Sequence, residues 1–142
     1  MFKNILVAVD EHEDPEQLLQ VLSDLGKMFS SKVTVLHLRE RRVLPNKVTE
    51  AESIPEAFAF GRDIARRLTE QGVNATAEVG SANPDTIGAR ILERAAEIEA
   101  DLIVIGGHKP HSVRERLLGD IGKELAHGAR CPLLMMPSLI DG

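Results

Sequence analysis

The sequence is poor in cysteine and in aromatic side chains. A single cysteine, Cys131, excludes a disulfide within the chain and any zinc site built from several cysteines. Four phenylalanines are present but no tryptophan or tyrosine, which argues against the stacking platforms that bind single-stranded nucleic acid. The opening run MFKNILVAVD reaches an acid too early for a signal peptide or a membrane span. We therefore expect a cytoplasmic protein.

Positive charge is also in deficit. Seventeen Lys and Arg residues face 22 Asp and Glu residues, which gives a net charge of -5. This balance disfavours a nucleic acid or an anionic membrane as partner, so we expect neither nucleic-acid binding nor membrane insertion. A length of 142 residues suits one domain and can bury a core without a disulfide or metal. We treat residues 1–142 as a single domain.

Strand-like and helix-like patterns alternate along the whole chain. The strand-like runs are residues 4–9, 32–38, 73–79, 101–106 and 131–136. Amphipathic helical patterns separate them, and this alternation predicts an α/β fold, a three-layer α-β-α sandwich around a five-stranded parallel, doubly wound sheet. With the first strand central, the strand order is 3-2-1-4-5. The polar stretch Arg39–Ser53 shows no period, and we expect it to form a long irregular loop of the kind that is often functional.

The predicted topology also locates a candidate binding site. Ligands of doubly wound sheets bind beyond the carboxyl ends of the strands, where the strand order reverses. Here the reversal falls between the first and fourth strands. The stretches VDEHED (residues 9–14) and GGHKPH (residues 106–111) would then line one crevice.

Several motifs resemble the universal stress protein family. NILVAVD, VTVLHL, ADLIVIGGH and LLGDIGKELAHGARCPLLMMP match it in order and spacing over nearly the whole chain. The resemblance implies a homodimer that pairs the C-terminal strand, Cys131–Met136, with its twin. Nucleotide-binding members of the family carry Gly, two residues, Gly, nine residues, Gly, then Ser or Thr. The corresponding residues here are Gly106, Lys109, Gly119 and Asp120, so two of the four markers have changed.

The two changed markers oppose a triphosphate. Glycine lets backbone N–H groups approach phosphate oxygens, and a hydroxyl donates to them. We expect Asp120 to be an N-cap, but its ionised carboxylate only accepts hydrogen bonds. Two anions about 4 Å apart repel by about 1 kcal/mol in water and by more in a drier cleft. Lys109, or a Mg²⁺ ion held by the acids of residues 10–16, could offset that repulsion, so both outcomes stay open.

The resemblance implies a larger set of site residues. The adenine and ribose side would comprise Ala8, Val9, Asp10, Leu38, Ile105 and Gly106, and the phosphate side His108, Lys109, Gly119, Asp120, Ile121 and Gly122. Asp10 either accepts from the nucleoside or caps its own loop. The base side is the less altered, so a ligand of AMP size or smaller is easier to hold than ATP.

Other chemistry finds little support. His12, His108 and His111 could meet near Asp10 as a metal site, but we expect no metal there. His37 is predicted to be a packed, hydrogen-bonded histidine of a strand, and Cys131 to fill core space rather than act as a nucleophile. We find no nucleophile and base that could work together, so we predict no enzyme.

The sequence therefore favours a non-catalytic, dimeric stress-response module with a degenerate nucleotide pocket and no cofactor. The alternative is an ATP- or AMP-binding, nucleotide-gated switch that uses Mg²⁺. The sequence identifies neither the stress nor the protein partners.

Overall fold

A central strand, buried on both faces, organises the chain. The computed structural model describes residues 1–9, 15–44, 47–50, 54–106 and 114–136. Strand β1 (Asn4–Val9) pairs in parallel with β2 (Lys32–Leu44) on one side and with β5 (Leu102–Ile105) on the other. Ile5, Leu6 and Val7 are each 0% exposed. A strand covered on both faces must be apolar at every position, which explains why this run shows no alternation.

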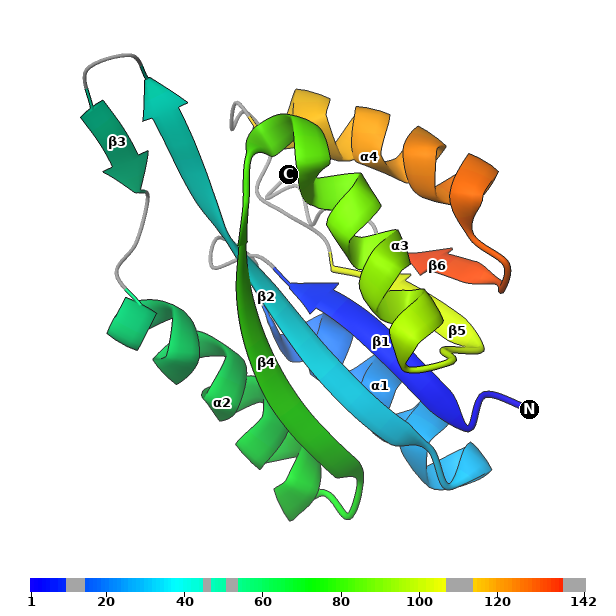
Figure 1. The fold of residues 1–142 in the computed structure, drawn as a ribbon. Helices are drawn as coiled ribbons and strands as arrows, with labels where there is room; N and C mark the ends of the chain where they lie inside the picture. Colours follow the sequence, from blue (N-terminus) through cyan, green and yellow to red (C-terminus); the bar gives the residue numbers. More distant parts are fainter. Residues whose placement is uncertain (10–14, 45–46, 51–53, 107–113, 137–142) are drawn as a thin grey trace, which may run out of the picture.

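Two further strands complete the parallel sheet. Strand β4 (Asn74–Ala82) pairs with β2, and β6 (Leu133–Met135) pairs with β5. The five parallel strands therefore have the order β4-β2-β1-β5-β6 (Figure 1). This confirms the predicted order 3-2-1-4-5 and the reversal of direction beside β1.

Helices cover the two faces of the sheet in pairs. Helices α1 (Pro15–Phe29) and α2 (Ile54–Glu70) lie on one face, and α3 (Ile87–Glu97) and α4 (Arg114–Gly128) on the other (Figure 1). The short 3₁₀ helix η1 (Pro84–Thr86) leads into α3. Each face has its own apolar cluster, which we call the α1/α2 cluster and the α3/α4 cluster. The α1/α2 cluster includes Val7, Leu22 and Leu68, and the α3/α4 cluster includes Leu6, Ile91 and Leu125.

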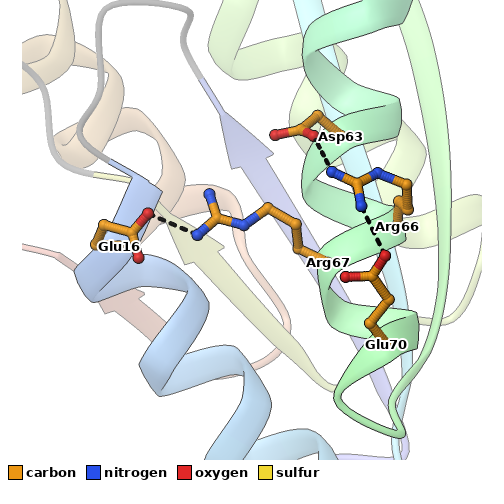
Figure 2. Close-up of polar contacts among 5 residues, drawn as sticks. All are labelled: Glu16, Asp63, Arg66, Arg67 and Glu70. Atoms are coloured by element: carbon orange, nitrogen blue, oxygen red, sulfur yellow. Dashed lines mark hydrogen bonds and ion pairs between the residues drawn. The ribbon is translucent and has the colours of Figure 1, made fainter.

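Ion pairs lie on the surface between α1 and α2. Arg67 of α2 donates to Glu16 in the first turn of α1 at 2.6 Å, and Arg66 donates to Asp63 and Glu70 along α2, also at 2.6 Å (Figure 2). The hydrogen bond that Arg67 donates to the Glu16 carboxylate raises the pKa of Arg67. Exposed pairs of this kind contribute little to stability, because water and salt screen their charges. Burial of the α1/α2 cluster beneath these ion pairs therefore does most to hold the two helices against the sheet. Among the described residues, no helix is long and apolar enough to cross a membrane.

The prediction of an irregular loop over Arg39–Ser53 is wrong for most of that segment. Strand β2 continues to Leu44 and pairs antiparallel with β3 (Lys47–Glu50), and Figure 1 shows this hairpin extending past the sheet. Val43 stands opposite Val48 in the register. The strand continues because ladder hydrogen bonds satisfy the backbone and valine favours extended conformations, even though charged residues hide the period.

Close packing at Gly26 of α1 gives a test of the fold. A Cβ built on Gly26 would lie 2.7 Å from Cγ1 of Val73, the residue before β4. Gly26→Ala should lower the free energy of unfolding by about 1–3 kcal/mol, because the added methyl overpacks a buried contact. Urea unfolding of Gly26→Ala, Val73→Ala and the double variant measures this. The double variant should be more stable than the sum of the single losses predicts, whereas simple additivity would contradict the contact.

Candidate functional site

The carboxyl ends of β1, β5 and β6 meet at one edge of the sheet. Ala8 is the register partner of Ile105, and the Gly106 N–H donates to the Ala8 carbonyl at 3.1 Å. The Met136 N–H in turn donates to the Ile105 carbonyl at 2.9 Å. We call Ala8, Val9, Ile105 and Gly106 the switch point. The topology thus brings together four predicted site residues that lie about a hundred positions apart in the sequence.

The amide of Gly106, the first glycine of the motif, is not available to bind a ligand. The Gly106 N–H is already used in the hydrogen bond to Ala8. Because Gly106 has no side chain, a ligand can approach its backbone closely. The Gly106 amide itself is therefore not a donor to a phosphate.

Side chains of the switch point face opposite layers. Ala8 and Ile105 pack with the α3/α4 cluster, whereas Val9 packs with the α1/α2 cluster. A ligand on the α4 side would therefore meet the side chain of Ala8 but only the backbone of Val9. Ile121 of α4 is 5% exposed within the α3/α4 cluster. It therefore supports the site from beneath and offers little surface to a ligand.

A buried histidine fixes the end of β1. His37 of β2 is 1% exposed, and its Nδ1 donates to the Val9 carbonyl at 3.0 Å. A carbonyl can only accept, so this bond requires the proton on Nδ1. The imidazole also lies 5.2 Å from the Phe60 ring of α2, centre to centre. This confirms the prediction of a packed, hydrogen-bonded histidine and shows that it positions the last residue of β1.

The sequence predicted that Leu38 ends its strand, and this prediction is wrong. Strand β2 continues six residues beyond it, and its register partner on β4 is Gly80. Leu38 also lines a cavity of about 650 Å³ that is bounded by β2, β4 and α3. Arg94 of α3 crosses this region and donates to Glu78 of β4 at 2.7 Å. This cavity is thus displaced from the switch point toward the β4 edge of the sheet.

The predicted N-cap role of Asp120 is wrong. Helix α4 begins at Arg114, six residues earlier, and passes through Gly119 and Asp120 without a break. Glycine in a helix costs roughly 0.5–1 kcal/mol, which is too little to end a helix that Ile121 and Leu125 anchor in the α3/α4 cluster. The backbone amides at residue 120 therefore belong to the helix interior and do not form its N-terminus.

Several predicted residues lie outside the described part of the chain. These are Asp10, His108 and Lys109, together with His12 and His111 of the metal hypothesis. Within the residues that the structure does describe, no three His, Cys, Asp or Glu side chains gather closely enough to hold a metal ion.

Sequence reasoning missed the burial of Arg39. This arginine is 5% exposed, and its Nη1 lies 3.4 Å from the Ser81 Oγ, to which it donates. Its position was available from the alternation of β2, because Val35, His37 and Arg39 occupy every second place and are all buried. Because Arg39 is charged, the sequence analysis placed it in the expected loop.

A model of the universal stress protein family matches residues 1–137. The chain belongs to this family. Universal stress protein YxiE of Bacillus subtilis is 25% identical over 150 residues, which cover 96% of this chain and 99% of that relative.

Solved structures of universal stress proteins share the fold. A family member from Burkholderia pseudomallei is 28% identical with a TM-score of 0.66, and the match covers 96% of this chain and 97% of that one. A universal stress protein of Archaeoglobus fulgidus, solved in complex with dAMP, is 24% identical with a TM-score of 0.66 and coverage of 95% and 98%. At that level of identity, the second likeness establishes the fold only.

The His37 contact gives a test of this universal stress protein's site. His37→Phe should lower the free energy of unfolding by about 1–3 kcal/mol, because it leaves the buried Val9 carbonyl without this donor. His127→Phe, at an exposed position in the last turn of α4, is the matched control and should change stability little. Equal losses for both variants in urea unfolding would contradict the positioning role of His37.

Proposed function

We propose that this universal stress protein is a non-catalytic regulatory module that binds a nucleoside monophosphate at the switch point in preference to ATP. The observation that carries the proposal is the replacement of two phosphate-side markers of the family motif, which are Lys109 and Asp120 in this sequence. The A. fulgidus relative bound to dAMP supports a ligand of that size on this fold.

The difference in charge between AMP and ATP accounts for the proposed preference. Asp120 precedes Ile121, which shares the α3/α4 cluster with Ala8 and Ile105. In the sequence, Asp120 stands at the Ser/Thr position of the family's nucleotide-binding motif, and the proposal assigns its carboxylate to the phosphate side of the ligand. A carboxylate repels added phosphates and has no proton to donate to them. Each further phosphate of ATP adds negative charge to the ligand, so AMP suffers this repulsion least.

Three described hydroxyl groups and the one thiol support the proposal of no catalysis. The hydroxyls of Ser31, Thr69 and Thr86 donate to backbone carbonyls rather than to a general base. Burial, and then the charge of Asp101, raise the pKa of the Cys131 thiol. A raised pKa leaves less thiolate at neutral pH, which suits a packing role for Cys131.

Isothermal titration with AMP and ATP, each with and without Mg²⁺, tests the nucleotide preference. The wild type should bind AMP more tightly than ATP. Asp120→Ser should strengthen ATP binding by about tenfold, equivalent to about 1.4 kcal/mol, because it removes a charge and adds a donor. Asp24→Ser, an exposed site on α1, is the control and should leave both affinities unchanged.

The opposite outcome supports the second candidate function. If the wild type binds Mg·ATP in the micromolar range and Asp120→Ser leaves that affinity unchanged, Lys109 or a metal offsets the carboxylate. The chain is then a nucleotide-gated switch. Binding of neither nucleotide by any variant would contradict both functions.

We also propose that two copies pair through the C-terminal edge of the sheet. Strand β6 pairs with β5 on one side and forms an edge of the described sheet. Met135 on this strand is 49% exposed although it belongs to a sheet. Unpaired strand edges are templates for another strand, and antiparallel pairing around the segment Cys131–Met136 would cover this one.

Light scattering after size exclusion tests the pairing. Met135→Lys should shift the mass from dimer toward monomer, because it places like charges near a two-fold axis. Met28→Lys changes a methionine that is 73% exposed on α1 and should leave the mass unchanged. A wild type that is monomeric at every concentration would contradict the proposed dimer.

A further inference from the structure

A cavity of about 630 Å³ lies between α3 and α4, which run side by side on one face of the sheet (Figure 1). Its lining includes Ala100 and Cys131, which stand just before β5 and β6. The switch point lies at the opposite, carboxyl ends of the strands. The cavity is therefore separate from the proposed nucleotide site. Most of its lining comes from α3 and the turn after it, and Cys131 alone belongs to the segment proposed to pair two copies.

Two glycines bring the helices into contact beside this cavity. A Cβ built on Gly128 of α4 would lie 2.5 Å from Cδ1 of Leu92 on α3. A Cβ built on Gly88 of α3 would overlap the carboxylate of Glu124 on α4. Farther along α3, alanines such as Ala96 line the cavity and are too short to fill the space between the helices. The cavity is therefore a result of how these two helices pack.

The inner wall of the cavity is apolar. Ile103 of β5, which is 1% exposed, belongs to this wall, together with Leu92 and Ala129. A hydrocarbon group placed against these side chains would leave water, which is favourable in proportion to the apolar area covered. The volume also falls within the range of about 300–1,000 Å³ that is usual for small-molecule sites. The cavity thus has the size and the surface to hold a small apolar group.

The polar part of the lining is mainly acidic. Glu93, Glu99 and Glu124 line the cavity, and Arg130 is the one cation in its lining. Glu93 lies 3.9 Å from Arg90, at the limit of an ion pair. Among the residues that the structure describes, Glu99 and Glu124 form no ion pair. The lining therefore carries negative charge that the cavity itself does not neutralise.

Two helix C-termini add to this negative potential. Helix α3 ends at Glu97 and α4 at Gly128, and residues just beyond each end, Glu99 and Ala129, line the cavity. The carbonyl groups of a helix C-terminus carry partial negative charge, which stabilises a nearby cation. The carboxylates and the helix ends therefore favour a ligand of the same sign.

We infer that this cavity binds a small organic cation with an apolar tail, of the alkylammonium class. The tail would lie against Leu92, Ala96 and Ile103. The ammonium group would face Glu99 and Glu124 at the same cavity. A neutral analogue keeps the apolar contacts but lacks the attraction to the carboxylates, and an anionic analogue is repelled by them. The sign of the head group should therefore decide the affinity.

Titration with hexylammonium, hexan-1-ol and hexanoate, followed by the amide shifts of a ¹⁵N-labelled sample, tests the inference. The three probes share an alkyl tail and differ in the charge of the head group. Hexylammonium should shift the amides of Ala96, Ala100 and Ala129 until they saturate. It should bind about threefold or more tightly than hexan-1-ol, because the carboxylates attract it. Hexanoate should bind most weakly.

Substitutions in the lining separate the tail contact from the charge. Ala96→Leu should weaken hexylammonium binding by about tenfold, because the larger side chain takes up the cavity. Ala59→Leu, at an exposed alanine of α2, is the matched control and should change nothing. Glu99→Gln and Glu124→Gln should each weaken hexylammonium binding by about threefold and leave hexan-1-ol unaffected. Glu70→Gln on α2, across the sheet, is the control for charge.

Three results would overturn the inference. One is the absence of saturable shifts at these amides with hexylammonium. Another is equal affinity for the three probes, and the third is an Ala96→Leu variant that binds hexylammonium like the wild type. No nucleotide enters these measurements, so the result is independent of the proposed AMP preference.

Discussion

The fold and the site both depend on the double pairing of β1. This strand hydrogen-bonds to β2 and β5, and helices cover both of its faces. Because Ile5, Leu6 and Val7 are fully buried, no part of the strand can shift without exposing apolar surface or breaking a ladder. The carboxyl end of β1 is therefore held in place. The Gly106 N–H donates to the Ala8 carbonyl, and the His37 Nδ1 donates to the Val9 carbonyl.

Much of this architecture could be predicted from the sequence because the strong patterns are local. ILVAV (residues 5–9) and LIVI (residues 102–105) are uniformly apolar, which is typical of a parallel strand that is covered on both faces. The register of His37 next to buried valines likewise predicts a packed imidazole. In these elements the local preference and the tertiary environment favour the same structure, so the periodicity suffices.

The failures occurred where local chemistry and long-range pairing disagree. Arg39 and the residues after it are charged, and charge suggested a loop, whereas pairing with β3 and β4 keeps them in a strand. Gly119 suggested a helix boundary, whereas packing of Ile121 and Leu125 carries α4 through it. At the candidate site, Ala8, Val9, Ile105 and Gly106 were placed by topology. The partner that the Arg39 guanidinium finds on Ser81 depends on a register that no single segment encodes.

The continuity of β2 limits how this protein can change in length during evolution. The same strand pairs in the parallel sheet and then in the hairpin with β3, and Val35, His37 and Arg39 are buried at every second position of it. One residue inserted between Leu36 and His37 would turn His37 and Arg39 to the other face of the strand, away from the partners that they contact now. Insertions are tolerated best at loop tips. Relatives that keep this strand should therefore carry their insertions outside Lys32–Leu44 rather than within it.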